Sequence, residues 1–289
     1  MALAVIAGPT ASGKSALALE WAEREGGVLV NADASQVYRD LSILSARPSA
    51  EDEARVPHRL FGVLDGARSC SASDWAAMAR AEVEMAHQTG RLPILVGGTG
   101  LYLRTLLWGI APVPPVADDV RAEIRAMTAG AVRQALEAAD PSMAARLHPN
   151  DRQRNGRALE VWRSTGRSLG DWQQTASVGG LGPLVQLRPL LLDPPVDQLG
   201  ARIDARIDWM WQNGALDEVR RLAARRLTPL LPVMRAIGVP PLMALLAGDL
   251  DERQALERWR TDTRRYAKRQ RTWFRHQTPD WPRWQAVQI

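Results

Sequence analysis

A chain of 289 residues is long enough for one large domain, or for a core domain that carries an insertion, and it can bury a sizeable core. No segment approaches the roughly 18 apolar residues of a membrane helix, no signal-like apolar run follows a basic start, and Cys70 is the single cysteine, so we expect a reduced, cytoplasmic protein without a membrane partner. The formal net charge of +5 favours an acidic partner such as nucleic acid, although genome bias also produces arginine-rich chains.

The first motif follows an apolar run at residues 3–7, which predicts a buried strand. Gly8, Gly13, Lys14 and Ser15 then fall at the spacing G-x-x-x-x-G-K-S, before a helix-forming run. A loop of this kind turns its backbone N–H groups around a phosphate, while the lysine reaches a terminal phosphate and the serine can ligate Mg²⁺. The alternative, a glycine-rich turn with an incidental lysine, is disfavoured because the chain has only one other lysine, Lys268, and because strand, loop and helix occur in the required order.

A second strand is predicted at residues 28–31, and Asp33 follows it. Because parallel sheets present their carboxyl ends at one edge, we expect Asp33 to lie near the phosphates. Residues 34–39 are polar and aromatic, which suits recognition of a planar group. The alternative is that Asp33 caps the next helix.

The middle of the first segment predicts a short strand at residues 61–64 and a helix that opens on a capping box formed by Ser71 and Asp74. A buried strand at residues 93–96 runs into four residues, 97–100, of sequence G-G-T-G. Motor ATPases and GTPases end such a strand with an acidic residue that organises Mg²⁺ and water, so that class of function fits poorly. The glycines indicate either a tight turn or a close backbone approach to a substrate.

Residues 111–116 form a proline-rich linker, and residues 118–165 predict several short helices with no strand pattern. A core strand returns at residues 184–192, at an edge or a bulge because it contains Pro189. We therefore predict an α/β fold, with a P-loop parallel sheet flanked by helices and an inserted small all-helical domain. The predicted boundaries give a core of residues 1–112 and 184–289 and an insertion of residues 113–183.

Cations gather in the insertion and near the C-terminus. Arg121, Arg154 and Arg157 could hold an RNA backbone, although a solvated arginine face explains the same pattern. Arg202 and Arg206 lie one turn apart on a predicted amphipathic helix. A last helix, at about residues 252–274, mixes basic residues (Arg264, Lys268, Arg271 and Arg275) with Trp259, Tyr266 and Trp273. This mixture fits a nucleic-acid surface, while the tryptophans also fit a core.

The motifs taken together resemble those of the bacterial tRNA dimethylallyltransferases, over nearly the whole chain. They are G-P-T-A-S-G-K-S at Gly8, Asp33 with Q-V-Y at Gln36, A-R-P at Ala46, P-H-R-L at Pro57, L-V-G-G-T-G-L-Y at Leu95, H-P-N-D at His148, R-A-L-E-V at Arg157 and R-Y-A-K-R-Q-R-T-W-F-R at Arg265. The resemblance implies transfer of a dimethylallyl group from its diphosphate to N6 of the adenosine 3′-adjacent to the anticodon in tRNA. It also implies Mg²⁺ as cofactor, and the anticodon stem-loop of tRNA and dimethylallyl diphosphate as partners. We expect a monomer.

The resemblance also assigns residues by their place in these motifs. The catalytic set is Asp33 as general base, Lys14 and Thr99, and the metal ligand is Ser15. The diphosphate-binding set is Gly8, Pro9, Thr10, Ala11, Ser12, Gly13, Lys14, Ser15 and Arg206. The tRNA-binding set is Asp33, Ala34, Ser35, Gln36, Thr99, Arg121, Gln153, Arg154, Asn155, Gly156, Arg157, Arg235, Ala236, Ile237, Gly238, Val239 and Pro240.

Three positions depart from the family pattern. Ala34 stands where the family has Ser, Leu44 to Pro48 reads L-S-A-R-P instead of G-T-A-K-P, and Val239 replaces Tyr.

Two other functions stay open on the residues alone. A nucleotide or small-molecule kinase could use Asp33 as its base and Arg152, Arg154 and Arg157 as lid cations, and an RNA-binding protein could use the loop as a nucleotide switch.

Overall fold

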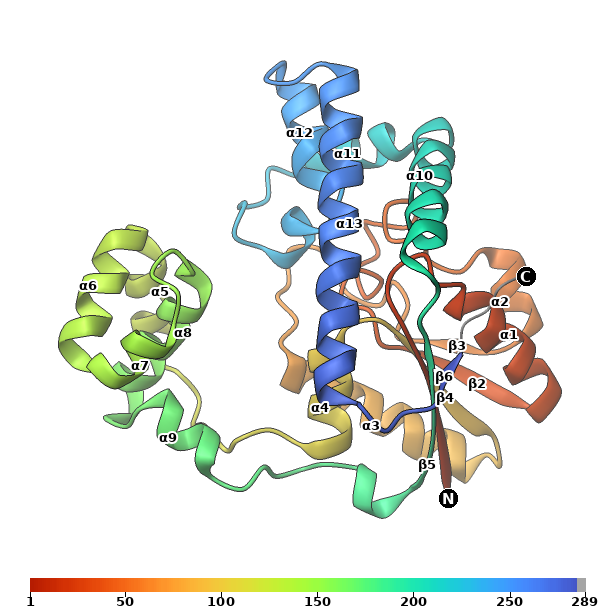
Figure 1. Cartoon of the computed structure of the whole chain (residues 1–289), viewed down its shortest axis with the longest axis horizontal. Helices are drawn as coiled ribbons and strands as arrows, with labels where there is room; N and C mark the ends of the chain where they lie inside the picture. Colours follow the sequence, from red (N-terminus) through yellow and green to blue (C-terminus); the bar gives the residue numbers. More distant parts are fainter. Residues whose placement is uncertain (285–289) are drawn as a thin grey trace. The chain divides into compact units, whose positions relative to one another are not determined.

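The structure is a computed structural model, and it describes residues 1–284, so the last five residues of the predicted core segment lie outside the described residues (Figure 1). The chain divides into two compact units. One comprises Met1–Leu107 together with the chain from Leu181 onward, and the other comprises Trp108–Gly180. The sequence-based boundaries at 112/113 and 183/184 lie within five residues of these divisions.

The first unit is built on a six-stranded sheet with the order β3-β2-β4-β1-β5-β6, and all five strand pairs are parallel (Figure 1). The strands are β1 Ala2–Ala7, β2 Gly27–Asn31, β3 His58–Arg59, β4 Leu92–Gly97, β5 Gln186–Leu192 and β6 Arg283–Trp284. The predicted fold class, a parallel α/β sheet with a helical insertion, is confirmed. Pro189 pairs in register with Val5 of β1, while β6 joins the other side of β5 only at Leu191 and Leu192, so the missing N–H of the proline costs no ladder bond there.

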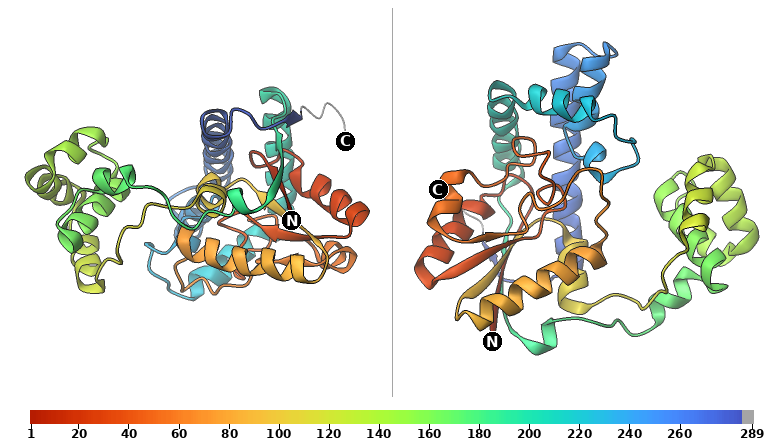
Figure 2. Two further views of the ribbon diagram at one scale, coloured as in Figure 1. Left: turned by 90° about the horizontal axis from the view of Figure 1, so that it is seen from below. Right: turned by 180° about the vertical axis from the view of Figure 1, so that it is seen from behind.

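Helices α1 Lys14–Glu25 and α3 Ala72–Gln88 pack on opposite faces of this sheet. The other helices of this unit are α2 Ala50–Arg55, α4 Gly100–Trp108, α10 Val196–Gln212, α11 Ala215–Ala224, α12 Val239–Ala247 and α13 Glu252–Gln277, with 3₁₀ turns at Gly182–Leu184 and Pro232–Arg235. Figure 2 shows α10 and α13 side by side, as their contacts require.

Alternation along β1 assigns its side chains to two cores. Ala4 and Ile6 pack with Ala18, Leu19 and Ala22 of α1. Residues of the opposite parity, such as Leu3 and Val5, belong to a larger cluster that includes residues of α3, α4 and the C-terminal helices. The strand is therefore buried on both faces, as is usual in parallel sheets.

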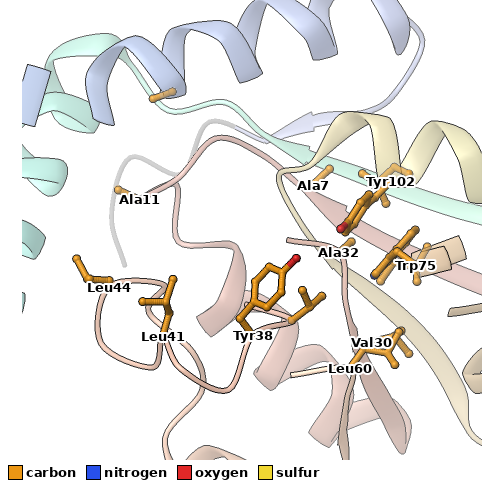
Figure 3. Packing of buried hydrophobic residues seen from close by; sticks show 14 of the residues in the cluster. Ala7, Ala11, Val30, Ala32, Tyr38, Leu41, Leu44, Leu60, Trp75 and Tyr102 are labelled. Carbon is orange, nitrogen blue, oxygen red and sulfur yellow. The ribbon is translucent and has the colours of Figure 1, made fainter. Parts of the chain in front are cut away.

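The larger core includes Val30 of β2 and Ala32 just beyond its end, together with Trp75 and Tyr102 (Figure 3). The rings of Trp75 and Tyr102 are stacked at 4.5 Å between centroids, and the indole Nε1 of Trp75 donates to the backbone oxygen of Asn31 at 2.9 Å. This packing fixes the strand end from which Asp33 emerges.

The second unit contains five helices, α5 Asp118–Ala126, α6 Ala129–Ala139, α7 Pro141–Arg146, α8 Arg152–Thr165 and α9 Leu169–Gln174. It has a core of its own, which includes Ile124, Leu136 and Leu159. A separate core explains how this segment can be inserted between strands of the sheet without disturbing their pairing.

The strand predicted at residues 61–64 is wrong. The strand lies earlier, at β3, and Leu64 forms a single bridge with Tyr38. Leu60 and Gly62 both have positive φ angles, 65° and 62°, which turn the chain away from an extended path.

The capping box predicted at Ser71 and Asp74, at the start of α3, is confirmed. Within residues 1–284, none of the helices combines the length and the apolar character needed to cross a membrane.

Candidate active site

The phosphate loop connects β1 to α1 and is held in a tight conformation. Gly13 has a φ of 92°, and a Cβ at Gly8 would lie 2.7 Å from the backbone oxygen of Leu192. Ala11 adopts a φ of 63°, which costs a non-glycine residue about 1 to 2 kcal/mol. The backbone N–H groups of Ala11, Gly13, Lys14 and Ser15 have no acceptor in the described part of the chain, so they are available to an anion.

Lys14 lies at the start of α1, with its Nζ 3.3 Å from the backbone oxygen of Pro9. Burial of the ammonium group lowers the pKa of Lys14 from 10.5 to about 8, Asp33 opposes this shift, and Arg206 adds to it. An anion beside Lys14 would reverse the shift.

Two arginines of α10 approach the same loop. Arg202 donates from Nη1 to the backbone oxygen of Ser12 at 3.4 Å. Burial lowers the pKa of Arg206, and the carboxylate of Asp33 opposes that shift. The sequence predicted Arg206 here but not Arg202, although their spacing of four residues on one helix face was the available signal.

Asp33 lies on an irregular segment after β2, and its carboxylate is aimed by local hydrogen bonds. Oδ1 accepts from the backbone N–H of Ser35 at 3.0 Å and from its hydroxyl at 2.6 Å. Buried Asn31 binds the backbone of Asp33 twice, through Oδ1 and Nδ2. The next helix, α2, begins only at Ala50, so Asp33 does not cap a helix. Its Oδ2 has no hydrogen bond to any described residue, which leaves that oxygen able to accept a proton. The role of Asn31 was missed, because buried polar residues at strand ends carry no sequence signal of their own.

The turn after β4 is packed against Asp33 and α13. The hydroxyl of Thr99 accepts from the backbone N–H of Ala34 at 2.9 Å and shares a hydrogen bond with the Tyr266 hydroxyl. A Cβ at Gly97 would lie 2.2 Å from the backbone of Ala32, and one at Gly100 would lie 2.3 Å from the ring of Trp273. Gly97 and Gly100 are therefore required by close contacts with other atoms of the protein, and not by a close approach to a substrate. Burial raises the pKa of Tyr266, and the negative charge of Asp33 adds to that shift.

A cavity opens between the phosphate loop and α10, with about 520 Å³ of space free of protein atoms, part of it open to solvent. Its polar lining comes from Thr10, Asp33, Ser35, Ser45, Arg206, Thr263 and Tyr266. Its apolar lining comes from Ala11, Leu44, Ile203, Ile207, Met210, Ile237 and Trp259. Figure 3 shows Leu44 on the loop that lies across from Ala11. The cavity can therefore hold a small apolar group between an anion site and a carboxylate.

Several residues predicted to contact RNA are instead buried or form hydrogen bonds within the protein. Gln36 donates from Nε2 to the backbone oxygens of Ser45 and Ala46. Val239 is 0 % exposed, and a Cβ at Gly238 would lie 2.8 Å from Trp259. Of the predicted run 235–240, Arg235 is exposed and Ile237 lines the cavity.

The residues of the insertion that were predicted to contact RNA also fall into two groups, one buried or closely ion-paired and the other exposed. Asn155 is 1 % exposed and donates to the backbone oxygens of His148 and Asp151. Gly156 is also buried, and Arg121 is paired with Asp118. Gln153, Arg154 and Arg157 are exposed on the first turns of α8, which makes this helix end a basic face of the unit.

The basic residues of α13 also fall into two sets. Arg264 pairs with Asp204 of α10, and Arg271 pairs with Asp193 through Nε at 2.6 Å. These two cations hold α13 in place. Lys268 and Arg275 are exposed and form no ion pair within residues 1–284.

The fold and the site define a class of protein. This is a P-loop α/β protein whose phosphate loop opens onto a partly apolar cavity with a carboxylate on its wall, and whose β4 strand ends in Gly97 and not in an acidic residue. That arrangement suits transfer of an apolar group from a phosphate ester better than transfer of the phosphate itself.

Comparison with known proteins gives the family. The family model "IPP transferase" matches residues 36–277. A tRNA dimethylallyltransferase of Sphingopyxis alaskensis is 56% identical over 283 residues, covering 97% of this chain and 92% of the relative, and that of Rhodospirillum rubrum is 56% identical over 281 residues, covering 95% and 85%. The chain belongs to the IPP transferase family.

Solved structures agree. The tRNA isopentenylpyrophosphate transferase of Bacillus halodurans superimposes with a TM-score of 0.70 at 32% identity, covering 98% of this chain and 89% of that chain. A eukaryotic dimethylallyltransferase acting on tRNA gives a TM-score of 0.78 at 28% identity, covering 94% of this chain and 69% of that chain.

Proposed function

We propose that this chain transfers a dimethylallyl group from dimethylallyl diphosphate to N6 of the adenosine 3′-adjacent to the anticodon in tRNA and releases diphosphate. The observation that carries the proposal is the cavity, in which the phosphate loop, Asp33 and an apolar wall meet. Prenyl transfer needs these three features together, because the diphosphate, the apolar allyl group and the amine that loses a proton have different requirements.

The phosphate loop holds the donor by its diphosphate. Free N–H groups of the loop and the start of α1 bind the phosphate oxygens, and Lys14 and Arg206 bring positive charge. As the bond between the allylic carbon and the diphosphate oxygen breaks, negative charge grows on that oxygen and these groups stabilise it. Arg202, which binds the loop at Ser12, adds a third cation beside this charge.

Asp33 takes the proton from the acceptor. The N6 amine forms the new bond to the allylic carbon, and the proton that it loses passes to Oδ2 of Asp33, the oxygen left free by Ser35. The adenine must leave its stack to reach an enclosed site, which an unpaired anticodon loop makes less costly.

Mg²⁺ fits this site only together with the donor. Ser15 is exposed in the first turn of α1, and that turn contains no acidic residue. No group of three or more His, Cys, Asp or Glu that could hold a metal occurs among residues 1–284. A Mg²⁺ ion accepts ligation by one protein oxygen plus phosphate oxygens and water. Ser15 would hold the ion, which would neutralise charge on the diphosphate.

The proposal is tested by locating the product. Purified protein is incubated with Mg²⁺, labelled dimethylallyl diphosphate and an anticodon stem-loop that has adenosine at the 3′-adjacent position, and the RNA is then digested to nucleosides. We expect the label in an N6-modified adenosine, with no label when inosine, which lacks the N6 amine, replaces that adenosine, and strong loss with EDTA. Equal labelling of the inosine RNA would contradict the assigned acceptor.

Lys14 gives the site a defined pH dependence. In the free protein its ammonium loses its proton near pH 8, and a bound diphosphate favours the protonated form, so binding takes up a proton above that pH. The Kd of an unreactive dimethylallyl diphosphate analogue should therefore rise about tenfold per pH unit above pH 8. Isothermal titration of wild type and Lys14→Met from pH 7 to 9.5 checks this, because the variant removes the effect while the protonation of the ligand itself stays the same. Parallel curves for the two proteins would exclude Lys14 from the anion site.

We propose that the basic face of α8 contacts RNA phosphates. Each phosphate contact adds about 0.7 to 0.9 to the slope of log K against log salt. The double variant Arg154→Gln, Arg157→Gln should flatten this slope by about 1 to 2 and weaken different tRNAs alike. Arg163→Gln is the matched control, since Arg163 lies near the other end of the same helix and pairs closely with Glu123, at 2.6 Å, whereas Arg154 and Arg157 pair more loosely with Asp151 and Glu160, at 3.5 and 3.6 Å. An unchanged slope in the double variant would remove α8 from the RNA interface.

A further inference from the structure

Gln270 of α13 connects two loops that are far apart in the sequence. It is 5 % exposed, its Oε1 accepts from the backbone N–H of Thr10 at 2.8 Å, and its Nε2 donates to the backbone oxygen of Gly98 at 2.9 Å. Both ends of the side-chain amide are therefore used. One partner belongs to the phosphate loop and the other to the turn that carries Thr99.

The hydrogen bond to Thr10 lies next to the residue of the phosphate loop whose backbone conformation is strained. Thr10 immediately precedes Ala11, whose backbone is in the left-handed region that a non-glycine residue adopts only when its surroundings impose it. With the N–H of Thr10 taken by Gln270, the N–H groups of Ala11, Gly13, Lys14 and Ser15 are the ones left for an anion.

The bond to Gly98 ties this loop to the acceptor side of the site. A Cβ at Gly98 would lie 2.2 Å from Nε2 of Gln270 and 2.7 Å from the backbone oxygen of Gly8, so the side chain fits only because residue 98 is glycine. The neighbouring residue, Thr99, accepts from the N–H of Ala34, next to Asp33. One buried amide therefore joins the loop after β1, which carries the anion site, to the turn after β4, whose Thr99 contacts the segment that carries Asp33.

We propose that Gln270 is a positioning residue that holds the phosphate loop in the conformation that receives the diphosphate of the donor. The inference rests on the proposed function, which places the diphosphate in that loop. Glutamate is a poor substitute, because a carboxylate can accept from Thr10 but cannot donate to Gly98, and it would bring a buried negative charge toward the diphosphate.

The test uses Gln270→Met, which keeps the approximate shape and removes both bonds, and Gln270→Glu, which keeps only the bond to Thr10. The matched control is Gln277→Met, since Gln277 is an exposed glutamine on the same helix. The measurements are the Kd of inorganic diphosphate with Mg²⁺, the Kd of tRNA without donor, the KM of dimethylallyl diphosphate, and thermal unfolding.

We expect Gln270→Met to raise the Kd of diphosphate and the KM of the donor about tenfold, with the Kd of tRNA within about threefold of wild type. Gln270→Glu should raise the Kd of diphosphate at least as much, because it combines a lost donor with added charge, and Gln277→Met should change none of these values. An unchanged Kd of diphosphate in a folded Gln270→Met protein would overturn the inference. Equal losses for diphosphate and tRNA would also overturn it, because they indicate general damage.

Two further comparisons keep the test decisive. If Gln270→Met does not fold, the Kd of diphosphate for Gln270→Glu decides the question, with an unchanged value counting against the inference. Lys14→Met separates this inference from the proposed function. If wild type binds diphosphate no better than Lys14→Met, the placement of the donor fails, whereas a clear loss in Lys14→Met without a loss in the Gln270 variants contradicts only the role of Gln270.

Discussion

Replacing Asp33 by asparagine is expected to lower kcat by about 10²-fold or more, while the Kd of tRNA stays within several-fold of wild type. A general base acts on a proton that moves in the transition state, so its loss affects turnover more than ground-state binding. The asparagine Oδ1 can still accept from Ser35, so the local fold is retained. Single-turnover transfer rates at saturating donor, with tRNA binding and thermal unfolding in parallel, measure the effect.

Asp249→Asn is the control for Asp33, since Asp249 is exposed near the C-terminus of α12 and its side chain makes no hydrogen bond or ion pair within the described chain. A normal kcat in Asp33→Asn, combined with a lowered melting temperature, would give Asp33 a purely structural role.

Replacing Lys14 by methionine should lower kcat on the order of 10²- to 10³-fold, because the leaving diphosphate loses a cation placed where charge grows. Burial makes this charge costly in the free protein, as the lowered pKa indicates, and although Asp33 offsets part of that cost, a bound diphosphate offsets more of it. The KM of the donor should rise as well. Steady-state kinetics in both substrates measure these effects.

Lys268 offers a contrast within the same chain, because it is the other lysine and is exposed on α13. Lys268→Met should leave the KM of the donor unchanged and raise only that of tRNA. A folded Lys14→Met protein with a near-normal rate would remove the phosphate loop from the donor site.

The parts of the site that sequence predicted well are those in which local spacing dictates geometry. Gly8, Gly13, Lys14 and Ser15 define a loop between a strand and a helix, and the structure has β1 and α1 at those places. Asp33 was placed by the rule that parallel strands end at one edge, and the cavity indeed contains it together with Thr10 and Arg206. Short-range patterns are enough for such features.

The parts that sequence missed depend on contacts between distant segments. Gln270 lies in a basic helical run, and no pattern in that run indicates that it reaches Thr10, which is 260 positions away. Arg264 and Arg271 were interpreted as part of an RNA surface, but acidic partners outside their helix occupy both. Helical spacing identifies the face of a helix but not the element that covers it.

Of the three departures from the family pattern, only the segment from Leu44 to Pro48 contributes residues to the cavity lining. Leu44 lines the cavity, and its backbone N–H donates to the buried carboxylate of Glu218 on α11 at 2.9 Å. Val239 is buried, so where the family has tyrosine this chain has an apolar core residue. Leu44 and Val239 are therefore held by contacts with distant segments of the protein, which is why those contacts could not be derived from the sequence.

The most direct test of the central claim is a comparison of two donors. The purified protein is incubated with Mg²⁺ and bulk tRNA, with labelled dimethylallyl diphosphate in one reaction and γ-labelled ATP in another that also contains nucleosides and nucleotides as small acceptors. The account predicts that allyl label enters tRNA, that EDTA stops this, and that ATP yields no phosphorylated product. Phosphoryl transfer from ATP without allyl incorporation, at saturating donor and with several tRNAs, would contradict the account and identify the protein as a kinase.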